Sequence, residues 1–177
     1  MPQSEEAQLG HRLHDPVRHN AWATARVLDY CRGLDEQTLN ATVPGTYGTI
    51  IQTLRHMIDA EVSYLFRLSG TRPAYSPQEG ESAGLAVLTE RATELARSWE
   101  QFLAGEVDSE RLGEGRGDNG AVFAIRAGVF VTQALHHASE HRAQICTILG
   151  ALGHEAPDVS AWGYALATGR STLQTSG

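Results

Sequence analysis

Apolar residues recur at helical spacing in four long stretches of the chain. Pro16 marks the start of the first stretch, because proline suits the first position of a helix. Thr49 introduces the second stretch, and Gly70 ends it in the way that glycine commonly ends helices. The pattern predicts amphipathic helices over about 15–32, 49–69, 83–103 and 121–149.

Glycine, proline and acidic residues separate these stretches, and we expect turns and loops over 40–48, 70–82 and 104–120. No stretch alternates convincingly between apolar and polar positions, so no β-strand is expected. Four amphipathic helices around one core predict an all-α, four-helix bundle over residues 8–153. A tail, 154–177, follows it with a short helix around 159–167. The longer loops leave room for a crossover, so both up-down and crossover orders fit the pattern.

Length and charge restrict the class of protein. The chain has 177 residues, which suits one domain, and its formal net charge is −7. All of its basic residues are arginine, and they form no basic run. This balance argues against binding to nucleic acid or to an anionic membrane. No apolar run approaches the ~18–20 residues of a membrane span, and no signal peptide is visible, so we expect a cytoplasmic protein.

The two cysteines, Cys31 and Cys146, lie far apart and in no C-x-x-C spacing. This argues against a disulfide framework and against a cysteine-ligated zinc site. We interpret both as small buried residues in a reducing compartment.

The strongest candidate chemistry lies in residues 135–142, Leu-His-His-Ala-Ser-Glu-His-Arg. His137 and His141 are four residues apart, so they share one helix face and could bind one metal ion at about 2.0–2.1 Å. His136 is turned about 100° away from them. That face also carries apolar residues, which places the pair in the core: Phe123, Phe130, Ala134, Ile145 and Ile148. Buried imidazoles need partners, and either a metal ion or hydrogen bonds to backbone or carboxylate groups would serve.

A third ligand should come from another helix, since metal sites in bundles draw on facing helices. His56 is the one histidine inside another predicted helix away from its ends, although it lies off the apolar stripe. Asp59, one turn later, is a candidate ligand or acceptor for the imidazole N–H, but a solvated acid is the simpler interpretation. The other histidines are expected outside the site. Three lie near the N-terminus and are expected to be exposed rather than to bind a metal: His11, His14 and His19. His154 follows the end of the last predicted long helix.

Three segments resemble the DinB/YfiT-like superfamily of bacterial four-helix metalloproteins. Residues 19–23, His-Asn-Ala-Trp-Ala, are similar to the asparagine-x-tryptophan-alanine run of the family's first helix. Residues 54–61, Leu-Arg-His-Met-Ile-Asp-Ala-Glu, are similar to its helix-two histidine segment. Residues 137–145 are similar to its H-x-x-x-H-R-x-Q signature. Together these segments span the chain from about 10 to 153.

The resemblance implies that His56, His137 and His141 bind a divalent metal ion, often nickel or zinc. The chain has Ala143 where the commoner form of the signature has glycine, and Glu140 where it often has histidine. Neither change touches an implied ligand.

The resemblance also implies secondary roles for other matched residues. Trp22 would be structural or line a pocket, and Arg142 and Gln144 would pack and form hydrogen bonds beside the site. Asp59, Glu61 and Tyr64 are candidate general bases only by their proximity on the second helix, and a structural role suits each better.

Characterised relatives use low-molecular-weight thiols, as thiol S-transferases or thiol-dependent isomerases. The resemblance therefore implies a metal-dependent transfer of a small thiol to an electrophile, with an open position on the metal. A metal-dependent hydrolase and a non-catalytic stress-response or structural metal-binding protein stay open as alternatives. A symmetric homodimer is expected, because this is the commonest oligomer.

Overall fold

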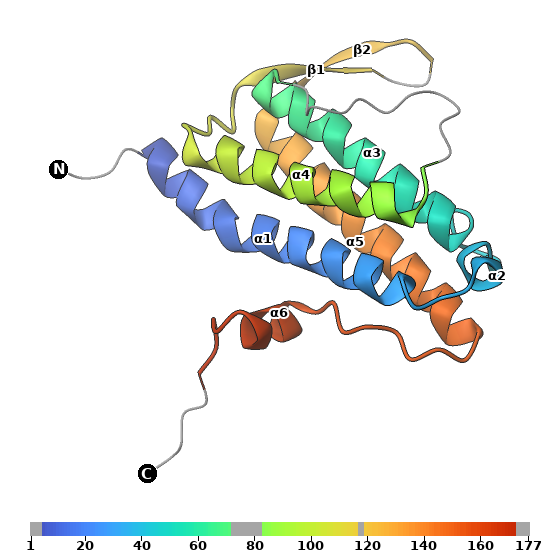
Figure 1. Ribbon diagram of the computed structural model, residues 1–177. Coiled ribbons are helices and arrows are strands. Elements are labelled where there is room, and N and C mark those ends of the chain that lie inside the picture. Colours follow the sequence, from blue (N-terminus) through green and yellow to red (C-terminus); the bar gives the residue numbers. More distant parts are fainter. Residues whose placement is uncertain (1–4, 72–82, 117–118, 173–177) are drawn as a thin grey trace.

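The computed structural model describes residues 5–71, 83–116 and 119–172, with side chains from His14 onward (Figure 1). It is mostly helical, with a small two-stranded sheet. The helices are α1 (Glu5–Cys31), α2 (Glu36–Leu39), α3 (Ile50–Ser69), α4 (Leu85–Ala104), α5 (Ala127–Ala151) and α6 (Ala161–Ala167). The strands are β1 (Leu112–Arg116) and β2 (Val122–Arg126). None of the described helices is long and apolar enough to cross a membrane.

The four long helices lie side by side, and each packs against two others (Figure 1). α1 contacts α4 and α5, and α3 contacts the same two helices. The consecutive helices α3 and α4 run in the same direction, as do α1 and α5. The four long helices therefore do not alternate in direction along the chain. The sequence pattern had allowed both an up-down and a crossover order.

The predicted ends of the second helix are confirmed by its caps. The Thr49 side chain accepts a hydrogen bond from the Gln52 N–H, and the Gln52 side chain accepts one from the Thr49 N–H. This capping box satisfies two backbone donors that the helix itself leaves free. Gly70 ends α3 with φ of 72°, a left-handed conformation that favours glycine.

The apolar faces of the long helices meet in one core. Burying each large apolar side chain stabilises the fold by about 1.5–3 kcal/mol. The most deeply buried side chains come from all four helices: Leu28, Leu54, Met57, Ile58, Leu88, Trp99, Ile145, Ile148 and Leu149.

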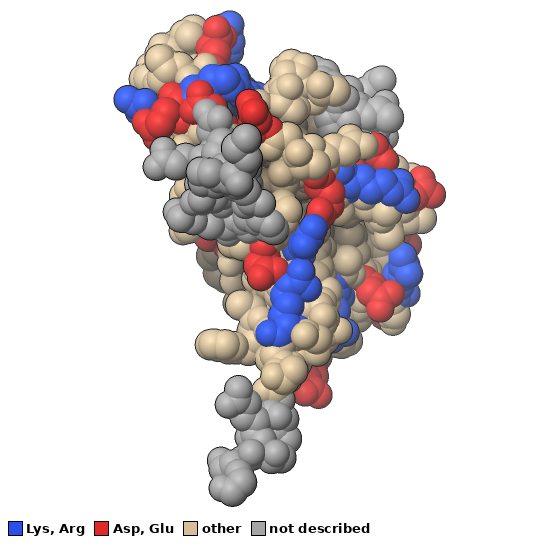
Figure 2. Space-filling model, turned by 90° about the vertical axis from the view of Figure 1, so that its left-hand side faces the viewer, with Lys and Arg blue, Asp and Glu red and all other residues tan. Residues whose placement is uncertain are grey.

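Charged side chains of both signs lie near one another on the face drawn in Figure 2. Several of the exposed ones form ion pairs, such as Arg18 with Glu100 and Arg97 with Glu94. Exposed pairs typically contribute no more than about 1 kcal/mol each. The apolar core, not these pairs, therefore holds the helices together.

The prediction for residues 104–126 was wrong. A loop was expected over 104–120 with a helix from 121, but β1 pairs with β2 in an antiparallel hairpin and α5 begins only at Ala127. Phe123, expected on the inner helix face, lies on β2 and is 50% exposed. The hairpin lies at one end of the helices and is mostly exposed, so its sequence shows no alternation of apolar and polar positions.

The start of the first helix was also predicted wrongly, since α1 begins at Glu5 and contains Pro16 in its interior. The helix predicted over 83–103 is α4, and its bounds were predicted to within about two residues. In the tail, the short helix is confirmed as α6, which lies along α1 (Figure 1).

Candidate metal centre

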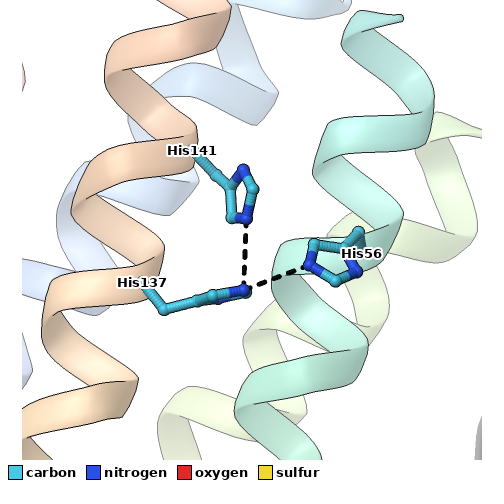
Figure 3. A group of neighbouring side chains, drawn as sticks. All are labelled: His56, His137 and His141. Atoms are coloured by element: carbon cyan, nitrogen blue, oxygen red, sulfur yellow. Dashed lines mark hydrogen bonds between the residues drawn. The ribbon is translucent and has the colours of Figure 1, made fainter. Parts of the chain in front are cut away.

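Three histidines from two helices meet between α3 and α5 (Figure 3). The Nε2 atom of His137 lies 3.1 Å from Nε2 of His56 and 3.1 Å from Nε2 of His141. These are the three residues that the resemblance implies as metal ligands, and the structure brings all three together.

Helix geometry explains this convergence. His137 and His141 are one turn apart on α5, and their ring centroids lie 4.4 Å apart. α3 packs along α5, and the His56 ring centroid lies 4.9 Å from each of the other two rings. His56 is off the buried stripe of α3 because it faces the edge of the α3–α5 contact, where it is half-buried. His141 is the deepest of the three, with 7% exposure.

The three nitrogens do not satisfy one another as hydrogen-bonding groups. A neutral imidazole Nε2 carries either one hydrogen or one lone pair, so His137 can form only one well-aligned bond to its two neighbours. A divalent cation accepts several lone pairs at once. Tetrahedral ligands at about 2.0–2.1 Å from an ion lie roughly 3.3 Å apart. The two separations of 3.1 Å from His137 are close to this value, and all three ligand atoms lie within 4.8 Å of one another. The donor set is therefore compatible with a divalent metal ion.

Electrostatics also favours the neutral rings that metals bind. Burial, together with the neighbouring His141 and His56, lowers the pKa of His137 to about 4. Burial and the nearby His141 lower the pKa of His56 as well. Neutral imidazole is the form that ligates a metal. Near neutral pH these rings therefore need no deprotonation before they bind an ion.

An aromatic side chain outside the predicted set covers part of the site. The Tyr47 ring stacks on the His56 ring with centroids 4.1 Å apart and an angle of 17°. It also meets the His141 ring edge-on at 5.3 Å. Sequence reasoning missed Tyr47 because it lies in a connection without periodicity, between Leu39 and Ile50.

A hollow of about 580 Å³ opens beside His56. It is open to solvent and borders His56, one of the three histidines. Its walls combine aromatic, charged and small residues: Tyr47, Gln52, Arg55, Asp59 and Ala60.

The three acid–base candidates on α3 take different positions. Asp59 is not among the converging ligand atoms, but lies in the hollow with its carboxylate 3.9 Å from the Arg91 guanidinium. Tyr64 meets the His137 ring edge-on at 5.9 Å. Glu61 turns into the core, where its carboxylate accepts a hydrogen bond from the Trp99 indole.

The other histidines lie outside the group of three. His136 is exposed and pairs with Glu140 at 3.4 Å, in agreement with the prediction. The expectation of exposed N-terminal histidines was wrong for His14 and His19, which are half-buried. Nε2 of His19 lies 2.9 Å from the Val159 carbonyl, so the tail covers it. The side chain of His11 is outside the described part of the chain.

The cysteines take no part in the site. Cys31 is buried, Cys146 is half-buried, and both are free thiols. Burial raises the pKa of Cys31 to about 12, so this thiol stays protonated and unreactive near neutral pH.

Two comparisons with known proteins bear on these residues. The DinB family model matches residues 1–173, which includes the three histidines and most of the tail. Among curated proteins, none matches the chain.

Proposed function

The chain belongs to the DinB family, and from this premise we propose that it binds a divalent metal ion and activates a low-molecular-weight thiol for transfer to an electrophile. The observation that supports this most is the convergence of the three Nε2 atoms beside an open hollow. We also propose that α1, α3, α4 and α5 correspond to the four-helix bundle of the family.

His56, His137 and His141 would hold the ion, and nickel or zinc would suit imidazole ligands. When bound, a divalent ion supplies Lewis acidity that lowers the pKa of a nearby thiol and favours the thiolate. Three protein ligands leave room for one exogenous group, as in catalytic zinc sites.

The protein's own residues would bind and orient the small thiol. The hollow has one cationic side chain, Arg55, and one anionic side chain, Asp59, on its wall. Arg55 donates a 3.0 Å hydrogen bond to the Ala83 carbonyl, which fixes its position. A thiol that carries amino and carboxylate groups would find an opposite charge for each. Tyr47 would limit the access of water to the His56 side of the site.

Metal content tests the first half of the proposal. We expect elemental analysis to find one nickel or zinc ion per chain in the purified protein, and His141→Ala to lose it. His136→Ala is the matched control, because His136 is on the same helix but exposed, and it should retain the ion. Equal metal content in both variants would refute the three-histidine site.

Enzyme turnover tests the second half of the proposal, the transfer of a thiol to an electrophile. The metal-loaded protein would be incubated with glutathione, bacillithiol or mycothiol and a chlorinated aromatic compound or an epoxide. The expected products are a thioether and chloride from the chlorinated aromatic compound, or a hydroxy thioether from the opened epoxide. Hydrolysis of an ester or amide without any thiol turnover would replace the transferase with a hydrolase. Metal binding without either activity would indicate a non-catalytic metal-binding protein.

We further propose a symmetric homodimer. Trp162 and Leu166, one turn apart on α6, are 81% and 74% exposed and present an apolar surface that a second copy of the chain would cover. Light scattering should give about twice the chain mass of 19.2 kDa. A mass near that of one chain would contradict the dimer.

A further inference from the structure

One side-chain oxygen connects the histidine cluster to the segment that covers it. Oε1 of Gln144 on α5 lies 3.1 Å from the backbone nitrogen of Tyr47, 97 positions away in the chain. A backbone N–H can only donate a hydrogen bond. The atom of Gln144 at this position must therefore be the amide oxygen, which accepts, and not the amide nitrogen.

The same oxygen lies 3.0 Å from Nδ1 of His141. Since this oxygen can only accept, Nδ1 of His141 must carry the hydrogen. A neutral imidazole then has its lone pair on Nε2, the atom that faces His137. Gln144 thus selects the tautomer of His141 that directs a lone pair to the centre of the cluster.

Gln144 also places the aromatic cover. Gln144 accepts a hydrogen bond from the Tyr47 backbone N–H. The Tyr47 ring stacks on the His56 ring and meets the His141 ring edge-on. One acceptor therefore sets the orientation of a histidine from α5 and the position of a ring over the histidine from α3. Hydrogen bonds to the outer nitrogen of a ligating histidine commonly orient the ring and strengthen metal binding.

We propose that Gln144 is the positioning residue of this centre, which holds His141 in its metal-binding tautomer and couples the cluster to the Tyr47 segment. The inference rests on the proposed metal site for its consequence on affinity, but the tautomer and the coupling are properties of the metal-free protein. Gln144 is not a metal ligand in this account, and it acts only through His141 and Tyr47.

The wild-type protein without metal provides the first test. With ¹⁵N-labelled histidine, nitrogen–proton correlation spectra distinguish protonated from unprotonated ring nitrogens, and His141→Ala identifies the signals of His141. We expect His141 with hydrogen on Nδ1. Hydrogen on Nε2 would overturn the proposal, and this measurement needs no variant that must fold.

Three variants provide the second test. Gln144→Leu keeps much of the side-chain volume but removes the acceptor, whereas Gln144→Glu keeps acceptor oxygens. Gln133→Leu is the matched control, since Gln133 is an exposed glutamine on the same helix. Circular dichroism melting would verify that each variant folds.

We expect Gln144→Leu to weaken zinc affinity by about 10- to 100-fold. Its Tyr47 amide should also exchange with solvent faster. Gln144→Glu should restore both properties, and Gln133→Leu should leave both unchanged. Wild-type affinity and Tyr47 protection in a folded Gln144→Leu variant would overturn the proposal. If the wild-type protein binds no metal but shows the Nδ1–H tautomer and Gln144-dependent Tyr47 protection, the proposed function fails while the positioning role stands.

Discussion

Arg142 donates a 2.8 Å hydrogen bond to Oδ1 of Asn20, a residue 122 positions away. The bond joins α5 to α1 inside the core, where the two residues are 3% and 2% exposed. Arg142 directly follows His141, and its side chain points to α1 while His141 faces α3. The buried guanidinium therefore fixes the rotation of α5 about its axis, and with it the direction in which the histidines point.

Asn20 extends this connection to the other two long helices. Its Nδ2 donates a 2.9 Å bond to Oε1 of Glu61 on α3, and the same oxygen accepts a 2.7 Å bond from the Trp99 indole on α4. One chain of buried hydrogen bonds thus joins all four long helices. Buried polar groups that lose their partners are costly, so this network is sensitive to truncation.

Replacing Asn20 with alanine should destabilise the protein by about 2–4 kcal/mol, because charged groups of Arg142 and Glu61 lose buried partners. Urea denaturation followed by circular dichroism measures this change. The control is Arg32→Ala. Arg32 directly follows α1 and forms an exposed ion pair with Asp29, so the change should alter stability by less than about 0.5 kcal/mol. Equal stability of the two variants would contradict the role of the network.

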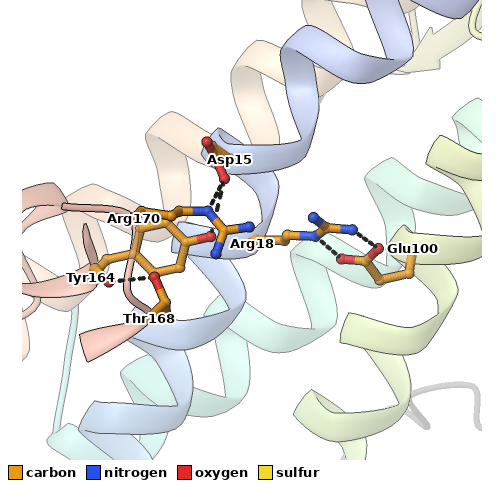
Figure 4. A network of polar contacts seen from close by, with 6 residues as sticks. All are labelled: Asp15, Arg18, Glu100, Tyr164, Thr168 and Arg170. Atoms are coloured by element: carbon orange, nitrogen blue, oxygen red, sulfur yellow. Dashed lines mark hydrogen bonds and ion pairs between the residues drawn. The ribbon is translucent and has the colours of Figure 1, made fainter. Parts of the chain in front are cut away.

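The tail is held on α1 by a separate polar cluster (Figure 4). The Tyr164 hydroxyl donates a 3.3 Å bond to the Asp15 carboxylate, and Arg170 pairs with the same carboxylate. Tyr164 is 5% exposed, and its ring meets the Trp22 ring edge-on at 5.7 Å. Trp22, for which the resemblance implied a structural or pocket-lining role, contacts the tail here and also lines a hollow between α1 and α4. Within the described part of the tail, Tyr164 is the one buried residue, so we expect it to contribute most to this docking.

Tyr164→Ala should release residues 154–172 from α1, because replacing a buried aromatic residue with alanine typically costs about 3–5 kcal/mol. Hydrogen exchange by mass spectrometry should show faster exchange in this tail and unchanged exchange in α3 and α5. Glu155→Ala, in the same tail but exposed and outside the proposed dimer contact, is the control. Wild-type exchange of the tail in Tyr164→Ala would refute this account of its docking.

The stability of the metal-free protein should depend on pH through the histidine cluster. His137 has a folded pKa of about 4, and burial also lowers the pKa of His56, whereas both titrate near about 6.5 in the unfolded chain. As pH falls from about 7 to about 4.5, the unfolded chain gains protons that the folded protein does not. This contribution therefore lowers the free energy of unfolding as the pH decreases.

Glu61 contributes to the pH dependence of stability with the opposite sign, because burial raises its pKa. A histidine variant separates the contribution of the cluster from that of Glu61. His137→Asn should show a smaller loss of stability than the wild type over this pH range in urea denaturation. His136→Asn, an exposed neighbour, should behave like the wild type. Identical pH dependence in all three proteins would show that the cluster does not titrate as described.

The parts of the fold that follow from periodicity could be predicted from the sequence. The α3 helix has a regular apolar stripe and complete caps, so its bounds were predicted correctly. The hairpin could not be predicted, since most of its residues are exposed and β1 contains Gly113 and Gly115, which are poor strand formers. Its geometry depends on its contact with the end of the helices and not on a local pattern.

The candidate site, like the fold, could be predicted only in part from the sequence. The i, i+4 spacing placed His137 and His141 on one face, but position alone left His56 doubtful, and the resemblance added it. The convergence of the three rings is confirmed, whereas metal ligation stays a prediction. Tyr47 and its bond to Gln144 join segments 97 positions apart, and no spacing rule relates two such residues.

Anomalous X-ray diffraction from crystals grown with nickel or zinc would locate an ion bound between α3 and α5. We expect one anomalous peak between these helices, about 2.0–2.1 Å from Nε2 of each of His56, His137 and His141. A metal peak elsewhere with no density among these rings, or a His56 ring turned to solvent, would contradict this expectation.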